Sequence, residues 1–296
     1  MTNLAITSRD RLALVILRAA VMLLPKLPGA TVDPLVQFSG RFAWLLNREG
    51  RRAVQGNLRV VLAREPSMQE IQSVFVTAVA NYVDLLRLPR LAQAGLATRV
   101  DVEGWENLSN GLAAGKGVLV ASLHLGNIEA VGYAARARDL SMVIPVERIE
   151  PPEFLREMIA LRERAGFRCV PVGQAAFRDI RAALSQNGVV GIGADRVTVG
   201  SGERVSFCGR PACMPVAAAA LALRTGAPLL PLASRRLPHG RFHCRIGPPI
   251  PTNSAAPGRA GLIEITERLL AALEVFLREN PTQWVVFRPV WDARSK

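Results

Sequence analysis

The chain has 296 residues, half of them hydrophobic, which is enough for a sizeable core in one large or two small domains. Its 37 lysines and arginines outnumber its 24 aspartates and glutamates, and this formal net charge of +13 suits an acidic partner: nucleic acid, an anionic membrane or an acidic carrier protein. Because aromatic residues make up only 5% and no nucleic-acid-binding motif is present, a membrane surface is favoured and nucleic acid is not expected.

The amino-terminal part, residues 1–98, is predicted to be helical and to associate with a membrane. Residues 12–24 are strongly apolar, but Arg18 interrupts the run and Pro25 ends it. A spanning helix needs about 20 apolar residues, so this segment is expected to lie in the membrane interface with its basic neighbours near anionic lipid. The alternative is an ordinary core helix. No secretory cleavage site is apparent.

Further helices are expected at residues 31–48 and 51–64. Residues 67–70 then form a capping-box pattern, Ser-Met-Gln-Glu, ahead of a long helix that runs towards Leu88. Pro89 is expected to end or kink that helix, because proline lacks a backbone N–H.

From Arg99 onwards, short apolar runs alternate with helical segments. Strands are predicted at residues 100–102, 117–122, 141–146, 168–172, 189–194, 228–233 and 242–246, and helices at 128–137, 152–165, 175–186, 216–225 and 262–278. Residues 284–287 form a possible last strand. This order predicts an α/β fold with a mostly parallel central sheet flanked by helices, over residues 99–296.

The four cysteines, Cys169, Cys208, Cys213 and Cys244, are widely spaced. They form no CxxC pair and no zinc-binding spacing with the three histidines. They are interpreted as small buried hydrophobic residues in a reducing compartment, and no metal site is predicted.

The most informative segment is His124 to Glu129, which follows the apolar run 117–123. Gly126 permits a tight turn and Asn127 is a good helix N-cap, so His124 is expected at the carboxyl end of a buried strand, where open α/β sheets bind ligands. Residues five apart on one helix face different ways, so Glu129 can reach His124 only across this turn. A carboxylate that is hydrogen-bonded to one imidazole nitrogen leaves the other nitrogen free to act as a base. The alternative is that His124 and Glu129 are solvated surface residues.

The chain resembles the lysophospholipid acyltransferase superfamily, in the branch of bacterial lipid A late acyltransferases and phosphatidylinositol mannoside acyltransferases. The resemblance rests on an ordered set of motifs: Arg52 with Asn57-Leu58, residues 102–108 (Val-Glu-Gly-Trp-Glu-Asn-Leu), residues 115–118 (Gly-Lys-Gly-Val), the His-x4-Glu motif of residues 124–129, Arg148, Arg162 and Arg164 before Gly166, Asp195-Arg196, residues 207–211 (Phe-Cys-Gly-Arg-Pro) and residues 281–284 (Pro-Thr-Gln-Trp).

The resemblance implies an O-acyltransferase whose catalytic dyad is His124 and Glu129. It implies transfer of a fatty acyl chain from an acyl carrier protein or coenzyme A thioester, a co-substrate and not a cofactor, to a hydroxyl of a lipid or glycolipid. Leu125 and Ile128 stand where relatives often have Phe and Trp, and Arg196 where many have Gln. These departures concern acceptor and chain-length preference.

In the expected mechanism, His124 takes the acceptor proton and Glu129 orients the imidazole. Arg148 is the candidate oxyanion donor, with help from the helix that begins at Asn127 and Gly126; the alternative is a surface arginine.

Two further basic elements have alternatives of their own. Arg162 and Arg164 are candidates for binding a phosphate, although a solvated helix face is the alternative for Arg164. Asp195 and Arg196 are expected either to hold polar acceptor groups or to close a buried ion pair.

The expected location is the cytoplasmic face of the cell membrane, as a peripheral or monotopic protein. Two rival functions stay open: a generic lysophospholipid or glycerophosphate acyltransferase, and a non-catalytic basic lipid-binding protein of the same fold.

Overall fold

The computed structural model describes residues 8–93, 95–149, 151–164, 166–197 and 202–291. At its centre lies a seven-stranded sheet with the strand order β1-β9-β8-β2-β5-β3-β4. The strands are β1 (Val100–Glu103), β2 (Val118–Ser122), β3 (Met142–Val146), β4 (Phe167–Pro171), β5 (Val189–Gly193), β8 (Leu229–Leu237) and β9 (Arg241–Ile246). Every neighbouring pair is parallel except β8 and β9. The predicted, mostly parallel sheet is therefore confirmed.

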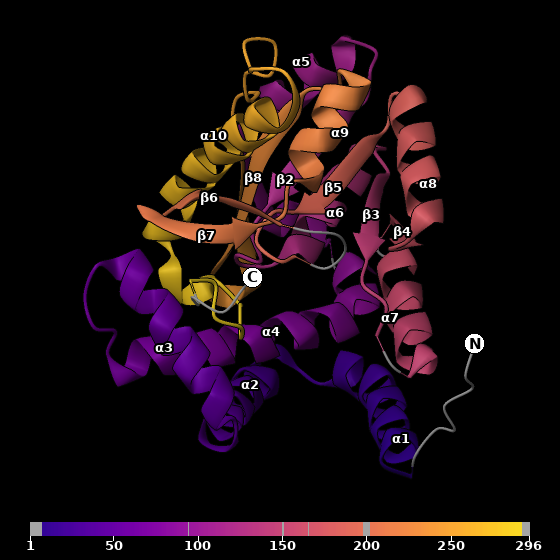
Figure 1. Cartoon of the computed structure of the whole chain (residues 1–296). Helices are drawn as coiled ribbons and strands as arrows, with labels where there is room; N and C mark the ends of the chain where they lie inside the picture. Colours follow the sequence, from indigo (N-terminus) through magenta and orange to yellow (C-terminus); the bar gives the residue numbers. More distant parts are fainter. Residues whose placement is uncertain (1–7, 94, 150, 165, 198–201, 292–296) are drawn as a thin grey trace.

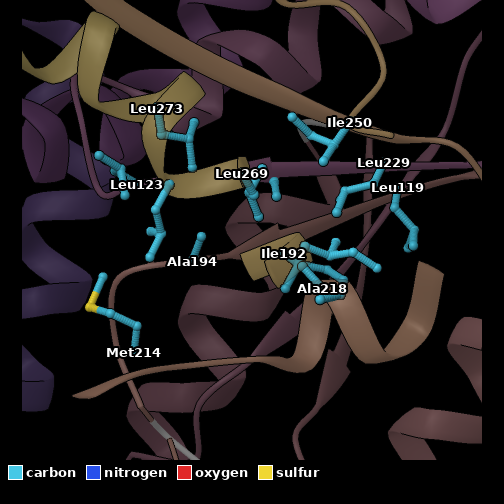
Figure 2. Close-up of a cluster of buried hydrophobic side chains, with 14 of the residues drawn as sticks. Leu119, Leu123, Ile192, Ala194, Met214, Ala218, Leu229, Ile250, Leu269 and Leu273 are labelled. Atoms are coloured by element: carbon cyan, nitrogen blue, oxygen red, sulfur yellow. The ribbon is translucent and has the colours of Figure 1, made fainter. Parts of the chain in front are cut away.

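Helices cover both faces of the sheet, because its strands are apolar on both sides. On β2, Val118 and Val120 belong to the core shared with α5 (Trp105–Ala113), α6 (Ile128–Arg136) and α7 (Pro152–Arg164). Leu119 and Ala121 face the other core, shared with α8 (Gln174–Ser185), α9 (Ala217–Thr225) and α10 (Gly258–Glu279). Figure 2 shows part of this second core, in which Leu119, Leu123 and Leu229 from the sheet side gather with Ala218, Leu269 and Leu273 from the helices, Leu273 beside Leu123.

Four helices precede the sheet and gather beyond one end of it (Figure 1). They are α1 (Ser8–Leu23), α2 (Gly29–Leu46), α3 (Arg48–Leu62) and α4 (Met68–Gln93). The capping box of α4 is confirmed: the Ser67 N–H donates to Glu70 Oε2 at 2.7 Å, and the Glu70 N–H donates to Ser67 Oγ at 3.2 Å. Pro89 does not end α4, which continues to Gln93; burial of apolar side chains such as Leu85 and Leu86 stabilises the helix despite the missing donor.

Three features differ from the sequence prediction. Helix α5 was not predicted. Nor was the antiparallel hairpin of β6 (Glu203–Phe207) and β7 (Arg210–Met214), whose outer backbone amides donate to Glu267 and Glu274 on α10. Residues 284–287 form no strand; a short helix, η4 (Pro281–Gln283), leads to a single bridge between Trp284 and Leu125.

Among the residues that the structure describes, no helix has both the length and the apolar character that a membrane span requires. The remaining short helices are η1 (Leu24–Lys26), η2 (Leu96–Arg99) and η3 (Pro238–Gly240). The division of the chain at residue 98 stays a prediction.

Candidate active site

His124 lies just beyond the carboxyl end of β2, in the turn that leads into α6. Gly126 in this turn has a φ of +65°, and a Cβ there would collide with the backbone of Ser234 on β8, so the position requires glycine. Asn127 caps α6, because its side-chain oxygen accepts the backbone N–H of Ala130 at 3.2 Å. The strand, turn and helix predicted around His124 are therefore confirmed.

Helix α4 holds this turn from the outside. The Asn81 side-chain amide donates to the Gly126 carbonyl at 2.6 Å, and the Asn127 amide donates to the Asp84 carboxylate at 2.7 Å. Asp84 also pairs with Arg236 of β8. Burial lowers the pKa of Arg236 to about 10. Sequence reasoning missed Asn81 and Asp84. The available signal was two polar residues, three positions apart, in an otherwise apolar helical stretch.

Asp195, which follows β5, is the carboxylate partner of His124. Its Oδ1 atom lies 2.6 Å from His124 Nδ1, and its Oδ2 atom accepts the His124 backbone N–H at 2.7 Å. The Asp195 side chain is fully buried, whereas 34% of the His124 side chain is exposed. Asp195 therefore pairs with His124, whereas Arg196 pairs with Glu147. With Nδ1 facing the carboxylate, Nε2 of the neutral ring is free of a proton and can act as a base.

The pKa values of this pair shift in opposite directions. Burial lowers the pKa of His124, but the charge of Asp195 and its hydrogen bond outweigh burial, so the pKa lies above the ordinary value. Burial raises the pKa of Asp195, yet the attraction of His124 and the hydrogen bonds from His124 and Trp284 outweigh it and lower that pKa. Arg196 and Glu147, which form an ion pair at 2.7 Å, act on His124 with opposite signs. The site therefore favours a proton on the imidazole.

Glu129 has a different partner from the one predicted. Its Oε1 atom accepts hydrogen bonds from Nε and Nη2 of Arg162 on α7, at 3.2 and 3.0 Å. Within the described structure no hydrogen bond joins Glu129 to His124, because Asp195 already occupies the imidazole Nδ1 and the Glu129 side chain, 13% exposed, lies against α7. The expected hydrogen bond between Glu129 and His124 is therefore not formed, and Arg162 takes the place of His124. Glu129 joins α6 to α7.

The other predicted arginines are dispersed. The charge of Arg196 lowers the pKa of His124. Arg148 is exposed, and its guanidinium lies close to Gly173, before α8, where a Cβ would be 3.6 Å away. Arg164 is also exposed, at the end of α7, where its carbonyl accepts a hydrogen bond from Arg136. Arg196 directly follows Asp195 in the chain and its charge lowers the pKa of His124, whereas Arg148 and Arg164 have exposed side chains.

Two residues near the carboxyl end of the chain complete the site. The Gln283 side chain bonds both backbone groups of Arg236, at 2.7 and 3.0 Å. The Trp284 indole donates to Asp195 Oδ2 at 2.8 Å. The signal for both residues was the Pro-Thr-Gln-Trp motif, which contributed to the resemblance without indicating a role.

A small apolar cavity lies on the sheet face that α5 and α6 cover. Its walls include Trp105, Val120, Val131, Ala134, Met142 and Leu232. Leu123 and Leu125 are buried in the core of the opposite face. Side chains along an extended segment alternate between the two faces of a sheet, and Val120 lines the cavity. His124, four residues further on, therefore lies on the same face as the cavity.

Helix α2 exposes an apolar face. Five large side chains recur along it at helical spacing: Leu35, Phe38, Phe42, Leu45 and Leu46. Phe38 is 69% exposed and stacks against Phe42, and Leu46 is 70% exposed. On α1, Val15, Ile16, Met22 and Leu23 are exposed as well. Exposed basic residues, Lys26, Arg41 and Arg48, lie in and beside these segments.

Three of the four cysteines are buried. All four are free, and burial raises the pKa of Cys169 to about 11 and that of Cys208 to about 12, which keeps them as thiols. Within the described part of the chain, no group of three histidine, cysteine or acidic side chains is arranged to hold a metal ion.

Comparisons with known proteins agree with the resemblance seen in the sequence. The chain is 31% identical to a phosphatidylinositol mannoside acyltransferase of Mycobacterium tuberculosis over 216 residues, 71% of this chain and 66% of that protein, so the match spans just under two thirds of the relative's length. It is 25% identical to a phosphatidylinositol mannoside acyltransferase of Mycolicibacterium smegmatis over 273 residues, 90% of this chain and 87% of that protein. The model of the bacterial lipid A biosynthesis acyltransferase family matches residues 7–293, and the chain therefore belongs to that family.

Proposed function

We propose that the protein is a membrane-associated O-acyltransferase that moves a fatty acyl chain from a thioester to a hydroxyl of a glycolipid. The observation that carries the proposal is the partly exposed His124, held by a fully buried Asp195 at the carboxyl edge of the sheet. Family membership and the names of the two mycobacterial relatives support the same reaction class.

In the proposed reaction, Nε2 of His124 removes the proton of the acceptor hydroxyl as its oxygen attacks the thioester carbonyl. A tetrahedral intermediate forms, the carbon–sulfur bond breaks, and the proton passes from the imidazole to the departing thiolate. Asp195 holds the ring tautomer and stabilises the imidazolium that exists between these two transfers. General-base action of this kind typically accelerates a reaction about 10²–10⁴-fold.

The negative charge on the tetrahedral oxygen needs a nearby donor. Arg196 supports this role better than Arg148, because its charge acts directly on His124 while Arg148 is exposed near Gly173. Its ion pair with Glu147 holds the guanidinium beside the site. Arg148 and Arg164 are proposed instead to attract the phosphate of the donor or of the acceptor lipid.

The acyl chain is proposed to enter between the sheet and α6, where a small apolar cavity of about 10 Å³, room for roughly one water molecule, must widen to receive it. The walls of the cavity carry only apolar side chains and cysteine, as a hydrocarbon requires. Each buried methylene contributes about 0.8 kcal/mol, so such a cavity selects chains by length. Both acyl carrier protein and coenzyme A thioesters suit a chain with a net charge of +13.

The apolar face of α2, together with α1, is proposed to insert into the membrane interface. Aromatic and leucine side chains on one helix face, with basic residues beside them, are typical of interfacial helices. Helix α4 contacts α2 on one side and the His124 turn on the other, through Asn81 and Asp84. Docking through α2 therefore brings the site close to the lipid acceptor.

Lipid analysis tests the proposed acceptor class. Mass spectrometry of lipids from cells with and without the protein should reveal a glycolipid that carries one acyl chain fewer in its absence. The purified protein should then restore that chain when it is given the isolated acceptor and an acyl thioester. Accumulation of a lysophospholipid would favour the generic lysophospholipid acyltransferase, and unchanged lipids with retained lipid binding would favour a non-catalytic binding protein.

A further inference from the structure

Trp284 is bonded to the carboxylate that holds the histidine. Its indole N–H donates to Asp195 Oδ2 at 2.8 Å, and both side chains are buried. The same oxygen accepts the backbone N–H of His124 at 2.7 Å, while Oδ1 faces the imidazole at 2.6 Å. Among the residues that the structure describes, Asp195 thus has two donors besides the imidazole, and Trp284 supplies the one that comes from a side chain.

The indole is held in place independently of Asp195. Its ring packs edge-on against Phe207 and Trp291, with centroids 6.0 Å away in each case. The backbone of the same segment is tied to the histidine turn, because the Val285 N–H donates to the His124 carbonyl at 2.8 Å. The N–H of Trp284 is therefore a pre-oriented donor that need not be ordered when the charge on Asp195 changes.

A hydrogen-bond donor on one carboxylate oxygen lowers the negative charge on the other oxygen, which faces the imidazole. A hydrogen bond to a charged group in a dry environment is stronger than one between neutral groups, and it draws negative charge away from the partner of the ring. With this donor present, Asp195 stays ionised although it is buried, yet attracts the imidazolium less than a bare carboxylate would. Both effects favour a base that can release its proton again during a reaction cycle.

We propose that Trp284 is a positioning residue that tunes the basicity of His124 through Asp195. The inference rests on the proposed function, in which His124 is the general base. The other charges that face the pair are Arg196, following β5, and Glu147, following β3. Asp84 of α4 and Arg236 of β8 lie behind the turn and neutralise each other.

The chain contains a matched control. Trp291 belongs to the same aromatic cluster, but its indole N–H donates to the backbone carbonyl of Phe207 at 3.1 Å. Trp284→Phe and Trp291→Phe both remove one indole N–H from this cluster. Only Trp284→Phe removes a donor from Asp195.

The first experiment is an NMR titration of the histidine ring protons, which needs no enzymatic activity. The chain has three histidines, and His124→Ala identifies the signal of interest. In Trp284→Phe, the His124 midpoint should move upwards by a few tenths to about one pH unit, because the less stabilised carboxylate attracts the imidazolium more strongly. In Trp291→Phe it should stay at the wild-type value.

An unchanged midpoint in a folded Trp284→Phe protein would overturn the inference, and so would equal shifts in both variants. If Trp284→Phe does not fold, the wild-type protein provides the test through its four indole N–H signals. The Trp284 signal should change with the His124 midpoint and the Trp291 signal should not; a Trp284 signal insensitive to that midpoint overturns the inference. The pH dependence of kcat/KM tests the proposed function separately. If the pH midpoint of activity differs from the titration midpoint of His124 measured by NMR, His124 is not the base.

Discussion

Asp195 Oδ1 lies 2.6 Å from Nδ1 of His124, although 71 residues separate the two in the chain. Strands β2 and β5 are parallel neighbours, and each residue follows the carboxyl end of one of them. The ladder continues up to the pair, because the Ala194 N–H donates to the Ser122 carbonyl at 2.8 Å. Sheet register, and not a long flexible loop, therefore sets the distance between the proposed base and its carboxylate.

Removing either member of this pair should nearly abolish transfer. His124→Ala removes the base, and Asp195→Asn leaves the imidazole without its charged partner; each should lower kcat by about 10²–10⁴-fold. The measurement is single-turnover transfer to the isolated acceptor. His239→Asn is the control, because His239 has a φ of +60°, which asparagine also adopts. Near-normal turnover of a folded His124→Ala protein would contradict the assignment.

Activity should fall as the pH drops through the pKa of His124. Because Asp195 raises that pKa, the acidic limb of kcat/KM should have its midpoint above about 6.5, the ordinary histidine value. In Asp195→Asn the raising charge is gone and burial remains, so the residual activity should have its midpoint at lower pH. By linkage, His124 stabilises the fold below its unfolded pKa, and this contribution is lost as the pH rises through the folded-state pKa. A wild-type midpoint at or below the ordinary value would be inconsistent with this pair.

Glu129 and Arg162 should behave as one unit. Breaking this partly buried ion pair with Glu129→Gln or Arg162→Gln should lower the free energy of unfolding by about 1–3 kcal/mol, and the double variant should cost little more than either single one. Urea unfolding of the four proteins measures this coupling.

Activity separates the two roles considered for Glu129. If its function is to join α6 to α7, both single variants should lose similar amounts of activity. A large loss in Glu129→Gln alone would restore the direct role at His124 that the sequence predicted. Glu163→Gln is the control, because Glu163 is exposed on the same helix and has no proposed role in binding.

The parts of this molecule that depend on local pattern could be predicted from the sequence. The capping box at Ser67, the glycine turn at Gly126 and the N-cap at Asn127 each depend on neighbouring residues, and all were predicted. The partner of His124 was not, because it is determined by which strands pair, and β5 follows β2 only after two intervening strands. Glu129 was chosen because it was near in sequence, whereas Asp195 is near in space. The hairpin of β6 and β7 was missed because it depends on partners far along the chain: the amides of Ser206 and Cys208 donate to Glu267 and Glu274 on α10.

The apolar face of α2 should carry much of the membrane affinity. Phe38→Ser combined with Phe42→Ser should weaken binding to vesicles that contain anionic lipid by about tenfold or more, because two exposed aromatic rings no longer enter the interface. Vesicle sedimentation measures this, and high salt should weaken the remaining binding by screening the arginines. Val275→Ser is the control, an exposed apolar residue of α10. Equal loss with both changes would argue against α2 as the membrane face.

Removing residues 1–26 should release part of the protein from membranes, because α1 also exposes apolar side chains; residues 1–7 lie outside the described structure. Extraction at alkaline pH distinguishes the kinds of attachment. Peripheral attachment predicts release of the full-length protein, and resistance to alkaline carbonate would show that the protein is integral.

Acyl-chain preference should depend on the cavity between the sheet and α6. Ala134 lines it, and Ala134→Leu should crowd the path that must widen for the acyl chain and move the preferred donor to chains that are shorter by about two or three carbons. Ala222→Leu is the matched control, since Ala222 is equally buried but lies on α9 in the opposite core. The measurement is the initial transfer rate for a series of acyl thioesters. A closed cavity predicts one maximum with lower rates on both sides, because a shorter chain buries less apolar surface and a longer one has no room. A flat rate from about ten to about eighteen carbons would place the chain in an open surface groove instead.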